Sequence, residues 1–153
     1  MRIRTLSFAV VAAAVVLAYT NRYANVPPHG DANARAEIEA MMSRSAAAWT
    51  RGDLDAFMRD YLPGERTTYV TSRGLVRGPE QIRASYAPRF APGALHDSLS
   101  FEGVEVDPLA PGVAHVVAWY VLTRGDSVVA RGPTSLVMLR TDEGWKIVHD
   151  HSS

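Results

Sequence analysis

The stretch Gly144-Trp145-Lys146-Ile147-Val148-His149-Asp150-His151 decides the fold. It begins at the Gly of the turn Thr141-Asp142-Glu143-Gly144, and its aromatic and β-branched residues are typical of a strand. Residues 128–140, on the other side of the turn, have the same character. The two segments therefore predict an antiparallel hairpin at the end of the chain.

Two more strands are expected before this hairpin. Residues 113–123 are almost continuously apolar, which predicts a strand covered on both faces. Residues 95–106 alternate between apolar and polar, but the alternation slips at Gly103, so we expect a β-bulge that bends the sheet there. A small hairpin is predicted from residues 67–71 and 75–77, around the turn Ser72-Arg73-Gly74.

Helical patterns come earlier in the chain. Apolar residues recur at three- and four-residue spacing over residues 34–51, which predicts an amphipathic helix. A short helix is expected over 54–61, capped by Asp53, and another from Pro79 through Phe90. Helices followed by strands indicate an α+β fold. We expect a cone-shaped α+β barrel, with a strongly bent antiparallel sheet wrapped around the N-terminal helices and enclosing a pocket.

The first 24 residues have a different composition. A basic start, Met1-Arg2-Ile3-Arg4, precedes the apolar run Phe8 to Ala18, which has the length of a signal-peptide core and is too short to span a bilayer. Residues 1–24 are therefore expected to be a signal peptide or an uncleaved N-terminal anchor, residues 25–33 a linker, and residues 34–153 the folded domain. This organisation predicts a periplasmic or secreted protein, attached to a membrane only if the N-terminal segment is retained.

Composition excludes several classes of function. The chain has 16 Lys and Arg against 16 Asp and Glu, with no basic stripe, so a nucleic-acid partner has no electrostatic support. It has no cysteine, which excludes disulfides, thiolate catalysis and Cys-ligated metals. No phosphate loop, dinucleotide fingerprint or nucleophile elbow is present, and no cofactor is expected.

The order of elements resembles the nuclear transport factor 2-like superfamily from about Ala34 to the C-terminus. Within it the chain is similar to SnoaL-like domains and to the association domain of calcium/calmodulin-dependent protein kinase II. The residues that carry the resemblance are Gly52-Asp53-Leu54, Pro63-Gly64, Val76-x-Gly78, His96, Leu122-Thr123 and Gly144 to Ser152. The kinase domains have arginines where this chain has Val121 and Leu136, so the resemblance does not imply carboxylate binding of that kind.

The alternation of side chains along the strands predicts which of them face the pocket. If Arg140 lies opposite Trp145, regular pairing places Leu136 opposite His149. The resemblance places Leu136 and Val121 on the concave face, so His149 and His151 are expected to share that face, while Asp150 points away. The expected pocket residues are Trp49, Tyr61, Tyr69, Tyr86, Trp119, Val121, Leu136, His149 and His151.

His149, His151 and Asp60 are the candidates for catalysis. Two histidines two residues apart on a strand project from one face and can pass a proton. A catalytic zinc site needs a third ligand, and no other histidine has diagnostic spacing, so no metal is predicted. Asp60 could act as a base if neighbouring aromatics raise its pKa. The competing interpretations are two hydrogen-bonded structural histidines and an ordinary surface aspartate.

Two functions remain open at this stage, and metal binding at His149 and His151 is a weaker third. The first is an exported domain that binds a small apolar or aromatic ligand and forms a homodimer through the doubly apolar strand. The second is an isomerase, cyclase or dehydratase that uses acid–base chemistry in the same pocket. The sequence does not decide whether the protein is an enzyme.

Overall fold

The computed structural model describes residues 33–153. The expected signal segment, residues 1–24, and nearly all of the expected linker lie outside the described residues. Within residues 33–153, no helix is both long enough and apolar enough to cross a membrane.

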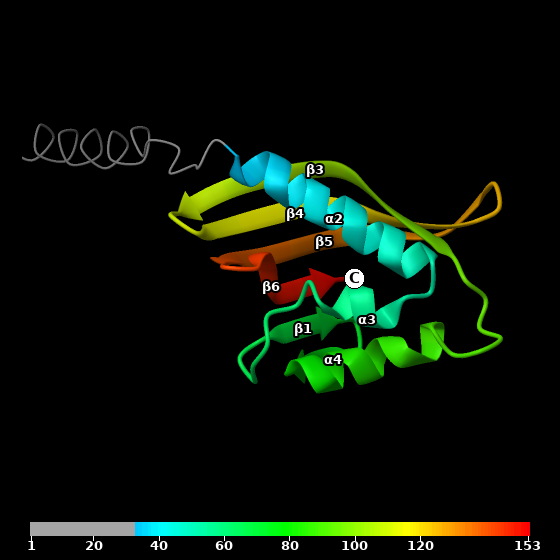
Figure 1. The fold of residues 1–153 in the computed structure, drawn as a ribbon. Coiled ribbons are helices and arrows are strands. Elements are labelled where there is room, and N and C mark those ends of the chain that lie inside the picture. The colour runs from blue at the N-terminus through cyan, green and yellow to red at the C-terminus, as the bar shows by residue number, and fades with distance from the viewer. Residues whose placement is uncertain (1–32) are drawn as a thin grey trace, which may run out of the picture.

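One mixed sheet of six strands forms the framework of the domain (Figure 1). Its strand order is β2-β1-β6-β5-β4-β3, and every neighbouring pair is antiparallel except β1 and β6. The order is linear, so the sheet is open rather than a closed barrel. The strands are β1 (Thr68–Thr71), β2 (Gly74–Arg77), β3 (Ser98–Ala110), β4 (Val113–Arg124), β5 (Ser127–Thr141) and β6 (Gly144–Ser152).

The helices pack against one face of this sheet. Figure 1 shows α2 (Ala34–Thr50) lying across the long strands, with α3 (Leu54–Met58) and α4 (Pro79–Tyr86) beside β1. Ile38, Met41 and Met42 on α2 are buried in the core with Met138 of β5. Trp145 ties the closing strand to the first helix, because its Nε1 donates to Glu37 at 3.0 Å. The α+β fold predicted from the sequence is confirmed.

Two helices end earlier than the sequence predicts. The helix expected to reach Tyr61 stops at Met58, because the backbone beyond it bonds to β6: Ile147 N donates to Asp60 O, and Leu62 N donates to Ile147 O. The helix expected to continue through Phe90 ends at Tyr86 and is followed by a 3-10 turn, Ala87–Arg89. Pro88 explains the change, since proline lacks the N–H that an α-helix needs and restricts the residue before it.

Four register shifts interrupt the pairing of the long strands, and two of them bear on the predictions. The bulge predicted at Gly103 is confirmed by a register shift between Glu102 and Glu105 opposite β4. A second one was not predicted: Met138 lies opposite Ile147, but Val137 lies opposite His149, so Val148 is the extra residue. The predicted pairing of Leu136 with His149 is therefore wrong, and Leu136 lies opposite Asp150.

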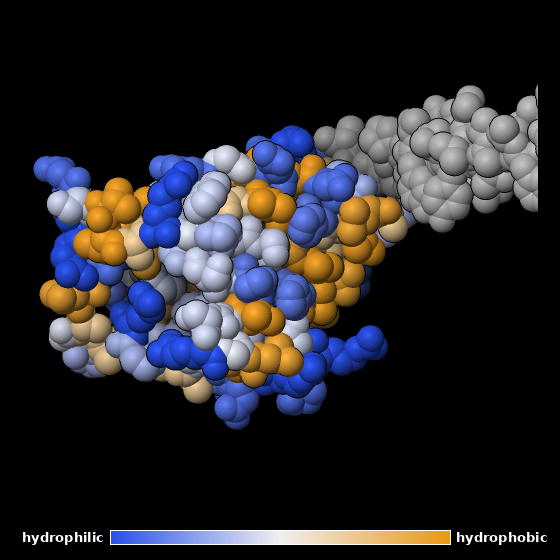
Figure 2. Space-filling model, turned by 180° about the vertical axis from the view of Figure 1, so that it is seen from behind, coloured by the Kyte–Doolittle hydropathy of each residue, from blue (hydrophilic) through white to orange (hydrophobic). Residues whose placement is uncertain are grey.

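The outer face of the sheet is less covered than the sequence predicts. Val117 and Trp119, in the strand expected to be covered on both faces, are 40% and 41% exposed. Seen from behind, the surface shows hydrophobic residues interrupted by hydrophilic ones (Figure 2). In the single chain, the outer face of β4 is covered at Val121, which is buried, but not at Val117 and Trp119.

Candidate functional site

A cavity of about 430 Å³ lies between the helices and the inner face of the sheet. The helices contribute Trp49, Phe57 and Tyr86, and the long strands contribute an apolar floor. The apolar and aromatic side chains around it are Trp49, Phe57, Tyr61, Tyr69, Tyr86, Leu99, Phe101, Tyr120, Leu122, Ala130, Leu136 and Ile147.

The aromatic side chains pack against one another and hold this wall in place. Trp49 meets Phe57 edge-on, with ring centroids 5.3 Å apart, and meets Tyr86 at 5.8 Å. Tyr69 stacks on Tyr86 at 5.1 Å. Trp49, Phe57, Tyr69 and Tyr86 therefore support one another on this wall through ring contacts.

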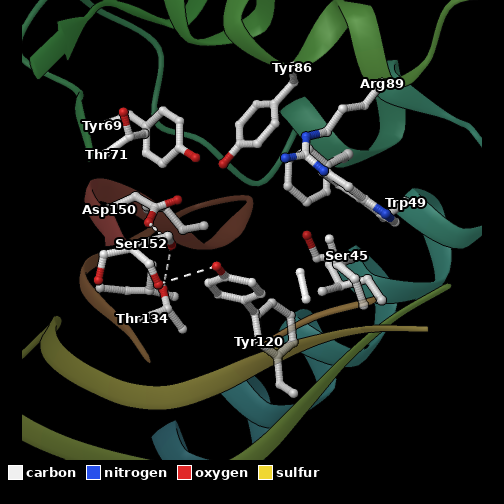
Figure 3. Close-up of a pocket in the computed structure, with 18 of the residues that line it drawn as sticks. Ser45, Trp49, Tyr69, Thr71, Tyr86, Arg89, Tyr120, Thr134, Asp150 and Ser152 are labelled. Carbon is white, nitrogen blue, oxygen red and sulfur yellow. Dashed lines mark hydrogen bonds between the residues drawn. The ribbon is translucent and has the colours of Figure 1, made fainter. Parts of the chain in front are cut away.

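The opposite wall is polar and is centred on Asp150, which is 4% exposed (Figure 3). Tyr61 donates its hydroxyl hydrogen to one carboxylate oxygen at 2.6 Å, and Ser152 donates to the other at 2.7 Å. Thr134 and Ser152 hydroxyls are 2.8 Å apart. An ionised carboxylate only accepts, so Ser152 gives its hydrogen to Asp150 and must accept one from Thr134.

Burial sets the ionisation of these groups. Removal from water raises the pKa of Asp150, and the hydrogen bonds from Tyr61 and Ser152 offset this in part. Burial, together with the nearby negative charge of Asp150, raises the pKa of Tyr61 well above its usual value. The tyrosine therefore stays a neutral donor, and Asp150 is a carboxyl that gains a proton more readily than one in water.

A row of tyrosine hydroxyls extends from Asp150 across the cavity. The Tyr61 and Tyr86 hydroxyls are 3.1 Å apart, and the Tyr69 ring stacks on Tyr86. Since Tyr61 gives its only hydrogen to Asp150, it must accept the hydrogen of Tyr86. Both of these hydroxyl hydrogens therefore point toward the carboxylate.

Five of the nine expected pocket residues lie on the cavity wall: Trp49, Tyr61, Tyr69, Tyr86 and Leu136. The other four, Trp119, Val121, His149 and His151, are not among the lining residues. On β4 the inward parity belongs to Tyr120 and Leu122, so Trp119 and Val121 face the other side of the sheet. Any role of these side chains in binding remains a prediction.

The two histidines are displaced by the bulge at Val148. One extra residue reverses the parity of everything after it, so Asp150 and Ser152 face the cavity in place of His149 and His151. His149 Nδ1 lies 2.7 Å from the Thr68 hydroxyl, and His151 is exposed. The prediction that these two imidazoles share the inner face with Leu136 is wrong.

Asp60 has a raised pKa, as the sequence suggested, and burial is the main cause. A hydrogen bond from Ser45 and the charges of Arg44 and Lys146 offset the increase. Ser45 lines the cavity but Asp60 does not. Asp60 thus lies next to a lining residue and is not itself part of the lining, and its role as a base stays a prediction.

Asp150 is the residue that sequence parity missed. Its signal was present as the only acidic residue of the closing strand, two positions before Ser152. Only the bulge, which lies in the backbone pairing, turns that side chain inward. Among the described residues, no group of three or more His, Cys, Asp or Glu side chains is placed to hold a metal ion.

Residues 38–153 match the SnoaL-like domain family, which is three quarters of the chain. The chain belongs to this family. The match confirms the resemblance to the nuclear transport factor 2-like superfamily, while the narrower likeness to the kinase association domain stays a prediction. Comparison with curated proteins gives no match.

Solved structures with the same fold support this membership. A nuclear transport factor 2-like protein of unknown function from Shewanella oneidensis is 28% identical, with a TM-score of 0.70 over 78% of this chain and 98% of that one. A superfamily protein from Salmonella enterica is 19% identical, with a TM-score of 0.67 over 81% and 92%. A candidate dehydratase of this family from Streptomyces avermitilis is 19% identical, with a TM-score of 0.66 over 77% and 93%.

Proposed function

We propose that this SnoaL-like domain binds a small, largely apolar molecule in the cavity between its helices and sheet. The observation that carries the proposal is a cavity of about 430 Å³ with a wall of mutually packed aromatic rings and a polar wall centred on Asp150. Ligand pockets commonly combine an apolar lining with a few convergent polar groups. A soluble fold that had no use for the space would gain stability by filling it.

The polar wall would orient the ligand. Asp150 can accept a hydrogen bond from a ligand hydroxyl or N–H group, and the Tyr69 hydroxyl can donate one to a ligand carbonyl oxygen. A ligand without such a group would leave Asp150 buried with only its protein donors. We therefore expect an aromatic or alicyclic body with at least one polar substituent to bind better than a plain hydrocarbon.

A cavity-filling variant tests this proposal. Ala130→Trp places an indole in the cavity from β5, whereas Ala91→Trp adds the same side chain at an exposed loop position. Compounds from an aromatic and alicyclic panel should raise the melting temperature of wild type and of Ala91→Trp but not of Ala130→Trp. Equal shifts in all three proteins would place the binding elsewhere and contradict the proposal.

Acid–base catalysis in the same cavity is the second candidate function. It is favoured by a buried carboxyl of raised pKa in an apolar cavity, which is an arrangement suited to proton transfer. Asp150 would take a proton from carbon next to a ligand carbonyl, while the Tyr69 hydroxyl, which also lines the cavity, hydrogen-bonds the carbonyl oxygen as negative charge develops there. Returning the proton to another carbon completes an isomerisation with no other reactant.

The catalytic proposal is tested with enolisable ketones in deuterated water. Wild type should exchange or shift the α-hydrogen, and Asp150→Asn should lose this activity. His149→Ala and His151→Ala should keep it, since neither side chain lines the cavity. If Asp150→Asn retained full turnover, Asp150 would not be the base, and binding without catalysis would be the better description.

Assembly and export are also proposed. The exposed Val117 and Trp119 on the outer sheet face support a homodimer, which light scattering of purified wild type and Trp119→Glu would test. The basic and apolar N-terminal segment supports export to the periplasm or beyond. Mass spectrometry of the protein recovered from cell fractions would show whether residues 1–24 are removed.

A further inference from the structure

Two arginines that lie in turns, rather than on an α-helix or a strand, take part in the lining of the cavity. Arg73 comes from the turn between β1 and β2, and Arg89 comes from the 3-10 turn after α4. A neighbouring hollow beside β2 and α4 has both of them in its lining as well. Both side chains are exposed, so they stand at the edge of the cavity rather than within the core.

Arg89 is directed toward the cavity rather than away from it. Its guanidinium carbon lies 5.8 Å from the centre of the Trp49 ring, and its positive charge is close enough to lower the pKa of Tyr69. Figure 3 shows the Arg89 side chain beside Trp49 and Tyr86, on the opposite side of the cavity from Asp150. The aromatic contact therefore holds a cation where a ligand would enter.

Neither arginine forms a salt bridge within residues 33–153. Arg83, on the preceding helix, pairs with Asp55, and Arg131 on β5 pairs with Glu102. The acidic group of the cavity, Asp150, is already engaged by Tyr61 and Ser152 at the far side. The cavity thus has its negative group deep inside and its positive groups at the rim.

We infer that the ligand is an organic anion, whose carboxylate or sulfonate group lies between Arg73 and Arg89 while its apolar body fills the aromatic cavity. This inference rests on the proposed binding function. Guanidinium groups donate paired hydrogen bonds that match such oxyanions. The reverse orientation is disfavoured, because it would bring a second negative charge against Asp150 in a poorly solvated place.

Two fluorescent probes with one skeleton test the inference. 1-Anilinonaphthalene-8-sulfonate is anionic, and N-phenyl-1-naphthylamine is the same molecule without the sulfonate. Wild type should bind the anionic probe about tenfold more tightly, which is the order expected for hydrogen bonds to a charged group. Raising the salt concentration should weaken binding of the sulfonate probe and leave the neutral probe unaffected.

Substitution of the arginines should remove this preference. In the double variant Arg73→Gln/Arg89→Gln, the dissociation constant of the sulfonate probe should rise about tenfold. The dissociation constant of the neutral probe should stay within about twofold of its wild-type value. Arg77→Gln, an exposed arginine on β2 outside both linings, is the matched control and should behave as wild type.

Failure of this inference differs from failure of the binding function. If both probes bind wild type equally, or the double variant keeps the tenfold preference, the inference is overturned and cavity binding stands. Ala130→Trp should block both probes. If neither probe binds wild type, or both still bind Ala130→Trp unchanged, the inference and the proposed function are both contradicted.

Discussion

Removing one hydroxyl, in Tyr61→Phe, tests how the buried carboxyl of Asp150 is stabilised. The ring stays in place between Phe57 and Tyr86, but the 2.6 Å donor to Asp150 is lost. A hydrogen bond to a charged group contributes about 1.5–3 kcal/mol, so we expect the variant to lose about 2 kcal/mol at pH 7. For a domain of this size that lowers the melting temperature by about 5–10 °C.

The pH dependence of this loss is the sharper part of the prediction. The pKa of Asp150 is raised in the folded state, so the free energy of unfolding falls as the pH rises and Asp150 loses its proton. The hydrogen bond from Tyr61 lowers that pKa. Without it the pKa is raised further, and ionising Asp150 costs the variant more stability than it costs wild type. The difference between the two proteins should grow from about 1 kcal/mol in acid, where the carboxyl is neutral, to its full size at neutral pH.

Urea unfolding at a series of pH values from about 4 to 7.5 measures this difference. Tyr120→Phe is the matched control, because its hydroxyl donates to the Ser153 carbonyl at 3.2 Å in an exposed place. That variant should lose less than about 0.5 kcal/mol at every pH. A Tyr61→Phe loss that is constant with pH, or largest in acid, would refute the assigned coupling to Asp150.

Three further outcomes are expected. Met138→Ala, which empties a fully buried site, should lower the free energy of unfolding by about 2–5 kcal/mol in urea titrations. Gly52→Ala should lower the free energy of unfolding by at least about 1 kcal/mol, because φ at this position is +72° and the added Cβ meets the His96 ring. Adding His96→Ala should restore only the part of this loss that comes from the clash with the ring. His151→Ala should change stability by less than about 0.5 kcal/mol and leave probe fluorescence unchanged, whereas His149→Ala should lose about 1 kcal/mol through its Thr68 partner.

Helix and strand positions followed from the sequence because they depend on local periodicity. The amphipathic helix ended within one residue of its expected limit, and the strand break at Gly103 was visible as a change of parity. Aromatic residues such as Trp49 and Tyr86 reached the cavity because large side chains on the buried face of a helix have few other places to go.

The sequence did not reveal which side chains of the last strand point toward the cavity. Parity arguments assume one residue per step, and the extra residue at Val148 adds no distinctive side chain to reveal itself. The parallel pairing of β1 with β6 was equally hidden, since it joins segments some 80 residues apart and depends on the whole sheet. Asp150 was therefore assigned to the outer face, although its distance from the turn was known.

The extra residue at Val148 also affects how this chain can be aligned with its relatives. In a family member whose last strand has no bulge, the inward-facing residue that corresponds to Asp150 comes one position earlier in the sequence. An ungapped alignment would match that residue with His149, which points elsewhere, and would pass over Asp150. A single gap at Val148 restores the correspondence, so transfer of site residues across the family requires superposed backbones rather than letters alone.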